Sequence, residues 1–216
     1  MNSIKLGSLF GFPVTLDPSA LAILALMVLL GAQGGAASAG YSFLLMLMVF
    51  GSVMVHELGH AFAARAYGLG PIAITLHGFG GLTRFTHAPK PRQGIFVTLA
   101  GPFAGFLLGL VALVASMFID GPVIGRLLVT ATTFNLFWSA FNLLPMYPLD
   151  GGSVTLHGLS LYKDPKVAMV WTARLGVLVA VGVGTAAVLT EQIFIGIIAL
   201  LSLMRTVPLA TSGSRD

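Results

Sequence analysis

Several stretches of this sequence are apolar over a length that suits a bilayer crossing. A membrane-spanning helix needs about 20 mostly apolar residues. Only 8% of the residues are charged and the mean hydropathy is +0.96, whereas a soluble domain averages about 25% charged residues. The sequence therefore predicts an all-α polytopic membrane protein, with a single transmembrane domain over residues 1–216. The six predicted spans are about 19–37, 41–66, 94–118, 125–145, 167–189 and 191–207.

The segment 70–87, "GPIAITLHGFGGLTRFTH", differs from its apolar surroundings. β-Branched and apolar residues flank a Gly-Phe-Gly-Gly break, which is typical of a hairpin. Non-helical backbone at membrane depth is tolerated only where protein packs around it or where it lines a cavity. We therefore expect a short membrane-associated β-hairpin beside the second predicted helix, with an ordinary surface loop as the alternative. Residues 4–16 are expected to lie extended at the surface.

The basic residues indicate an orientation in the membrane. If the amino terminus is cytoplasmic, Arg126 is the only basic residue in a loop on the far side, and Arg174 falls inside the fifth segment. By the positive-inside rule, both termini are predicted to be cytoplasmic. The scattered placement also excludes a nucleic-acid-binding stripe. The residues assigned to the cytoplasmic side are Lys5, Arg65, Arg84, Lys90, Arg92, Lys163, Lys166, Arg205 and Arg215.

The second predicted helix ends in an ionisable cluster, His56-Glu57-Leu-Gly-His60. Residues at i and i+4 share a helix face, so both imidazoles can bind one zinc ion. Glu57 stands beside them as a general base for a zinc-bound water, whose pKa falls towards about 7. The alternative, two histidines packed against lipid headgroups, leaves an uncompensated carboxylate in an apolar helix. The pattern therefore predicts a hydrolytic zinc site.

A catalytic zinc site usually has three protein ligands and a water, so a third ligand is required. The chain has seven acidic residues and no cysteine. Asp150, in "FNLLPMYPLDGG" at 141–152, is predicted at the end of the fourth helix and at the same membrane face as His60. Two prolines break the helix before it, and two glycines after it allow close approach. Asp150 is the predicted third ligand, and a helix-ending turn with a solvated Asp is the alternative.

Together these motifs carry a resemblance. HELGH paired with N-x-x-P-x-x-P-L-D-G-G at 142–152 resembles the site-2 protease family of intramembrane zinc metalloproteases. The stretches "GSLFGFPV", "ITLHGFGG" and "LAGPFAG" also have counterparts in such proteins. The resemblance implies a three-helix catalytic core, about residues 41–152, formed by the second to fourth segments. The accessory helices would then be 19–37, 167–189 and 191–207.

The resemblance also implies a set of site residues. Its zinc ligands fall on His56, His60 and Asp150, its general base on Glu57, and a substrate or oxyanion contact on Asn142. For Asn142 an interhelical hydrogen bond alone is the alternative. The sequence departs from the family pattern at Gly105, where many members carry Asn, and at "LDPSA" near the first helix. We expect no appended PDZ or CBS domain and no cleaved signal peptide.

The predicted function is hydrolysis of peptide bonds within or near transmembrane segments, as in regulated intramembrane proteolysis. A transmembrane protein or peptide would be the substrate, Zn²⁺ the cofactor, and a prokaryotic inner membrane the location. The active site would lie near the cytoplasmic side. A catalytically silent membrane scaffold of the same fold is the first alternative. A zinc-binding transporter or channel is the second, and it is disfavoured because only one polar cluster exists, at one end of the membrane.

Overall fold

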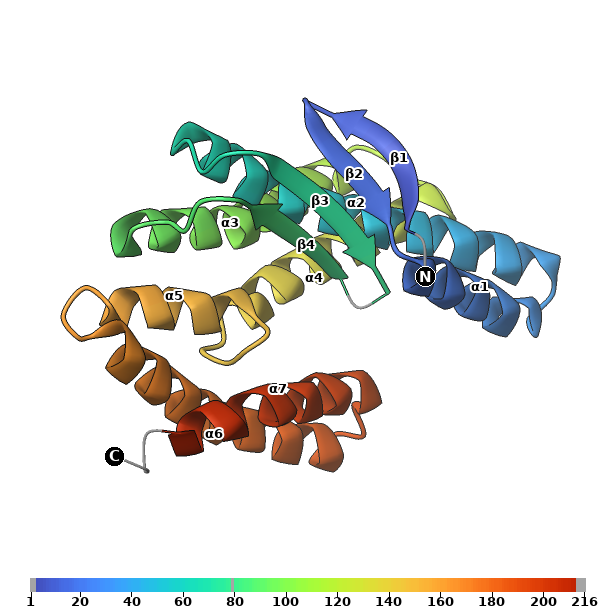
Figure 1. The fold of residues 1–216 in the computed structure, drawn as a ribbon. Coiled ribbons are helices and arrows are strands. Elements are labelled where there is room, and N and C mark those ends of the chain that lie inside the picture. Colours follow the sequence, from blue (N-terminus) through green and yellow to red (C-terminus); the bar gives the residue numbers. More distant parts are fainter. Residues whose placement is uncertain (1–2, 79, 213–216) are drawn as a thin grey trace. The chain divides into compact units, whose positions relative to one another are not determined.

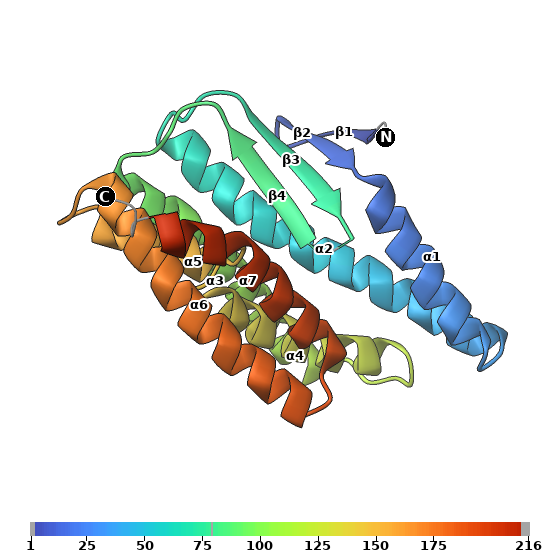
Figure 2. The ribbon, with the colours of Figure 1, turned by 60° about the horizontal axis from the view of Figure 1, so that its bottom comes forward.

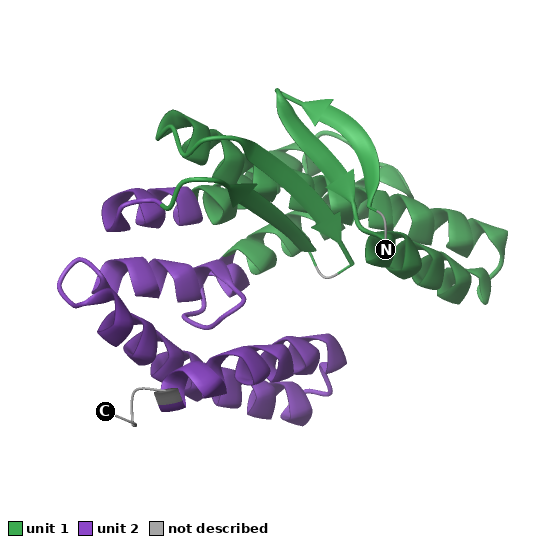
Figure 3. Ribbon diagram, in the orientation of Figure 1, with its two compact units in different colours: residues 1–88, 100–139 green, residues 89–99, 140–216 purple. Residues whose placement is uncertain are grey.

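The structure is a computed structural model that describes residues 3–78 and 80–212 (Figure 1). Phe79 of the Gly-Phe-Gly-Gly break and Arg215 of the cytoplasmic basic set lie outside the described residues. The chain divides into two compact units, residues 1–88 with 100–139 and residues 89–99 with 140–216 (Figure 3). The predicted single domain stays a prediction.

The elements are β1 (Ile4–Leu9), β2 (Phe12–Leu16), α1 (Pro18–Ala32), α2 (Ala36–Ala66), β3 (Ile72–His77), β4 (Gly80–Phe85), α3 (Pro91–Ser116), α4 (Ile124–Asn142), α5 (Asp150–Leu159), α6 (Pro165–Leu189) and α7 (Ile193–Ser212).

Four helices of the described chain, α2, α3, α6 and α7, are long and apolar enough to cross a membrane. The protein is an integral membrane protein. A helix occupies each of the six predicted spans, but α1 has only 15 residues. α4 has 19 residues and falls below the others in hydropathy because it carries Arg126, several threonines and two asparagines. The count of six crossings therefore stays a prediction.

A four-stranded sheet lies in the first unit, in the order β1-β2-β3-β4. β1 pairs antiparallel with β2, and β3 pairs antiparallel with β4, so the strands of the expected hairpin at 70–87 form. Its membrane association stays a prediction. β2 and β3 pair in parallel, with Val14 opposite Ile74. Residues 4–16 are thus part of the sheet and not merely an extended surface segment.

The sheet lies along α2, as two views show (Figures 1 and 2). In β3 the alternate residues Ile72, Ile74 and Leu76 are buried, as expected when one face of a strand is packed. β3 and β4 both contact α2. This packing brings the side chains of β4 against the part of α2 that carries HELGH.

The connection before Asp150 differs from the predicted course. α4 ends at Asn142, and Asp150 is not at the end of that helix but in the first turn of α5, a helix that the sequence did not predict. A carboxylate there is favoured by the helix dipole. A side chain at Gly151 would overlap the carbonyl oxygens of residues 143 and 144. The glycines are therefore needed for the close wrap of this connection, which overrides their poor helix propensity.

Candidate metal centre

The HELGH residues of α2 form a buried cluster. His56, Glu57 and His60 are each at most 8% exposed, and their possible ligand atoms lie within 4.8 Å of one another. The Nε2 atoms of His56 and His60 are 3.1 Å apart, and the two rings meet edge to face with centroids 4.8 Å apart. The two residues that helical spacing predicts to share a face do so, with the same nitrogen of each ring turned towards the other.

This arrangement fits a metal ion. Tetrahedral zinc binds imidazole nitrogen at 2.0–2.1 Å, which sets two such nitrogens about 3.3 Å apart. Gly101 of α3 borders the same place. A Cβ at Gly101 would overlap Nε2 of His60 and lie 2.8 Å from Nε2 of His56. The missing side chain therefore keeps open the space in front of both nitrogens, where an ion would sit.

Glu57 is held by the sheet. Thr83 Oγ1 of β4 donates a hydrogen bond of 2.7 Å to Oε2 of Glu57 and lies 3.1 Å from the backbone oxygen of the same residue. A Cβ at Gly81, two residues earlier on the same strand face, would overlap the Glu57 side chain. The sequence analysis missed both residues. The one signal that could have suggested them is their spacing: in "GLT", Gly81 and Thr83 are two residues apart, so they share one face of a strand.

Two further contacts surround the histidines. Asn135 of α4 donates from Nδ2 to Ser52 Oγ at 2.9 Å, one turn before His56, and so joins α4 to α2. A Cβ at Gly105 of α3 would lie 2.7 Å from Ser139 Oγ and 3.8 Å from Nδ1 of His56. Ser139 thus places a buried hydroxyl beside the position where the sequence departs from the family pattern.

Asp150 and Asn142 belong to the second unit, whereas HELGH belongs to the first. Asn142 is the last residue of α4 and is 7% exposed. Asp150 begins α5. The assignment of Asp150 as third ligand and of Asn142 as a substrate contact therefore stays a prediction.

Known proteins are similar to this chain in sequence and in fold. The model of Peptidase family M50 matches residues 43–126, which include HELGH. Zinc metalloprotease MJ0392 of Methanocaldococcus jannaschii is 33% identical over 153 residues, 70% of this chain and 44% of that protein. The structure of a site-2 protease from the same organism aligns with a TM-score of 0.74 and 28% identity, covering 97% of this chain and 95% of that one. The chain belongs to the site-2 protease family.

Other members extend the comparison. A Synechocystis sp. relative is 38% identical over 163 residues, and a Mycobacterium tuberculosis relative is 31% identical over 194 residues. The chain spans less than half the length of these curated relatives, which are named as zinc metalloproteases, between 43% and 49%.

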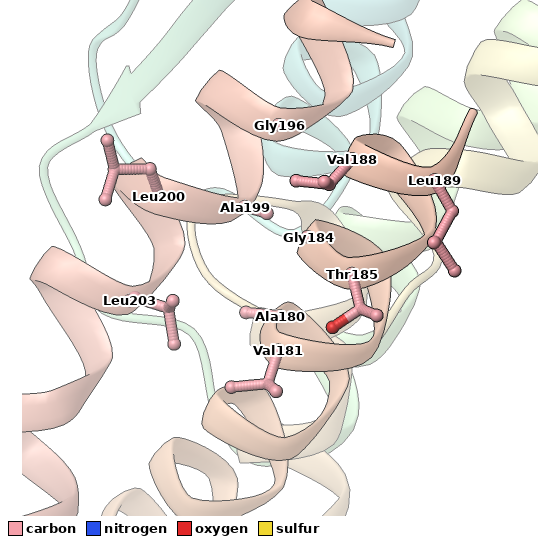
Figure 4. A pocket seen from close by; sticks show the side chains of 10 residues that line it. All are labelled: Ala180, Val181, Gly184, Thr185, Val188, Leu189, Gly196, Ala199, Leu200 and Leu203. Carbon is pink, nitrogen blue, oxygen red and sulfur yellow. The ribbon is translucent and has the colours of Figure 1, made fainter. Parts of the chain in front are cut away.

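A groove lies between α6 and α7. It encloses about 470 Å³ and is lined by small and apolar residues such as Ala180, Gly184, Ala199 and Leu203 (Figure 4). Thr185 is the only lining residue with a polar side chain, and none of the lining residues can carry a charge. The side chains of the HELGH cluster, which could hold a metal ion, lie on α2 and not among the residues that line this groove.

The pKa values of Asp17, Tyr147 and His157, which lie outside the long apolar helices, are shifted. Hydrogen bonds from the side chain and backbone of Ser19 lower the pKa of Asp17, the N-cap of α1. Burial raises the pKa of Tyr147 and lowers the pKa of His157. The His157 ring lies against Gly94, where a Cβ would overlap it. Asp17 thus caps α1, and the His157 ring packs against α3.

Proposed function

We propose that the protein is an intramembrane zinc metalloprotease that hydrolyses peptide bonds within or near transmembrane segments. The observation that carries the proposal is the paired Nε2 atoms of His56 and His60, facing the space left by Gly101, with Glu57 beside them on an apolar helix. Relatives named as zinc metalloproteases support it.

The metal ligands in this proposal are His56, His60 and Asp150. When bound there, zinc supplies Lewis-acid activation of water and of the scissile carbonyl. Two neutral imidazoles and a carboxylate are a donor set that suits zinc. Asp150 is proposed because of its motif, and the two glycines that follow it let the connection wrap closely around it.

Glu57 is the proposed general base. It accepts a proton from the attacking water and then donates it to the leaving amine nitrogen. Its burial, at 5% exposure, keeps bulk water from competing for that proton. The amide of Asn142 would donate a hydrogen bond to the substrate or to the developing oxyanion.

The substrate must present an unwound backbone, since a helix hides its carbonyl groups in hydrogen bonds. β3 lies between β2 and β4, so the outer edges of the sheet are β1 and β4. We propose that the substrate adds to β4 as an extended strand. A photo-crosslinker at exposed Leu82 of β4 should capture substrate, and one at exposed Leu6 of β1 should not. Equal capture at both positions would reject this binding mode.

The metal assignment is tested by zinc content. Purified wild type and Glu57→Gln should each hold about one zinc per chain, and Asp150→Ala should hold markedly less. Zinc that is unaffected by Asp150→Ala would reject the third ligand.

Activity is tested in vesicles. Wild type reconstituted with bacterial membrane proteins should generate new peptide termini, detected by mass spectrometry, and Glu57→Gln should not. Zinc binding without any cleavage would favour the silent scaffold. Cleavage by Glu57→Gln at the wild-type rate would reject the general base.

The proposed location is a prokaryotic inner membrane, with both termini in the cytoplasm and the site near that side. The support for it is the uneven distribution of Lys and Arg among the loops.

A further inference from the structure

Strand β4 contacts Glu57 through two residues of one face. Gly81 and Thr83 are two positions apart, so their substituents point to the same side of the strand. Thr83 is half-buried and Glu57 is almost fully buried. The contact therefore lies in the protein interior, where an electrostatic hydrogen bond is stronger than in water.

The two carboxylate oxygens of Glu57 have different neighbours on β4. Oε2 accepts the hydroxyl of Thr83 at 2.7 Å, a length typical of a hydrogen bond to a charged acceptor. A Cβ at Gly81 would overlap Cγ of Glu57 and would lie 2.6 Å from both Cδ and Oε1. Any side chain at position 81 would therefore crowd Oε1, and glycine leaves space beside it.

We infer that Thr83 is a positioning residue for the general base: its hydroxyl holds Oε2 of Glu57, and Gly81 leaves Oε1 accessible as the oxygen that exchanges the proton. The inference rests on the proposed role of Glu57. A Glu side chain has three rotatable bonds, and fixing one oxygen sets the direction of the other. Loss of such placement by about 1 Å can lower a rate by about 100-fold.

The backbone oxygen of Glu57, 3.1 Å from the same hydroxyl, gives Thr83 a second acceptor. The hydroxyl can turn to it when the carboxylate holds a proton, so no buried donor is left without an acceptor during the reaction. A valine at position 83 has nearly the same shape and offers no donor, whereas a serine retains the donor.

The kinetic test compares Thr83→Val with Thr83→Ser. Thr83→Val should lower kcat by about 10- to 100-fold with KM and zinc content unchanged, and Thr83→Ser should stay within about threefold of wild type. Thr86→Val is the matched control, because Thr86 is exposed and its hydroxyl donates to the backbone oxygen of Pro71, at 3.4 Å, rather than to Glu57. Loss of zinc in Thr83→Val, or equal loss of rate in Thr83→Ser, would overturn the inference.

A second measurement does not depend on proteolytic activity, because it observes the resonance of the Glu57 carboxyl group directly. The chain contains only two glutamates, Glu57 and Glu191, so zinc-free protein labelled with ¹³C at the glutamate carboxyl should give two side-chain resonances. Glu57→Gln identifies the Glu57 resonance. Thr83→Val should shift it, and Thr83→Ser and Thr86→Val should leave it in place. An unshifted resonance in Thr83→Val would overturn the contact. Full cleavage by Glu57→Gln would instead reject the proposed role of Glu57 as general base and leave this spectroscopic result valid.

Discussion

Gly101 is a residue whose importance comes from what it lacks. A methyl group there would overlap the Nε2 atoms of both histidines. We expect Gly101→Ala to weaken zinc binding by about 10-fold or more, in the range found for changes next to metal ligands. The measurement is a competition titration with a chelator.

The control for this variant is Gly51→Ala in α2, because a Cβ at Gly51 meets nothing within 4 Å. It should bind zinc as wild type does. Wild-type affinity in Gly101→Ala would show that the ion does not occupy the space between the two nitrogens.

His157 should make stability depend on pH. Burial lowers its pKa below the usual value of about 6.5. The unfolded chain therefore takes up a proton at a higher pH than the folded chain, and stability falls as the pH drops below about 6.5 towards the folded pKa. Between pH 8 and pH 5, the melting temperature in detergent should fall more for wild type than for His157→Gln. Parallel curves for the two proteins would contradict the prediction.

At the level of single residues, the sequence predicted only part of the candidate metal site. The spacing of His56, Glu57 and His60 along one helix predicted their cluster, because helical geometry alone brings them together. Gly101 and Thr83 reach the same cluster from α3 and β4. Their contacts depend on tertiary packing that no local pattern specifies, so the sequence analysis missed them.

Among the elements, the apolar helices were the most predictable, because length and hydropathy determine them. α5 was missed since Gly151 and Gly152 oppose a helix locally, while close packing against residues 143–147 requires them. The strands of the hairpin were predicted from adjacent residues. The extension of this hairpin by β1 and β2 was not predicted. The parallel pairing of β2 with β3 joins Thr15 to Thr75, which are 60 positions apart in the sequence.

The packing of α3 against α5 leads to a prediction about the stability of the protein. A Cβ at Gly94, near the start of α3, would overlap the His157 ring on α5. Gly94→Ala should destabilise the protein by about 1–3 kcal/mol, the usual cost of overpacking. Thermal unfolding in detergent measures it.

Gly182→Ala in α6 is the control, since a Cβ there meets nothing within 4 Å. Adding His157→Ala to Gly94→Ala should restore part of the loss by removing the ring that the methyl group strikes. A double variant that is less stable than either single one would show that the ring is not the obstacle.

The membrane topology of the whole molecule can be tested by cysteine labelling. The chain has no cysteine of its own, so only the introduced cysteines react. Single cysteines at Lys5 and Lys90 should react with an impermeant maleimide only after the cytoplasmic side is opened. A cysteine at Asp120 should react in intact cells. Labelling of position 5 in intact cells would place the amino terminus outside and reverse the proposed orientation.

The parallel pairing of β2 with β3 determines when this protein can be completed during synthesis. β1 and β2 emerge first, but the partner of Thr15 is made 60 residues later. At 5–20 residues per second this is a delay of about 3–12 seconds, during which α1 and the long apolar helix α2 are synthesised. Thr83 then follows Glu57 by 26 residues. The helix that bears the proposed base is therefore synthesised before the strand that holds it, and the proposed hydrolytic site cannot be complete until β4 has been made.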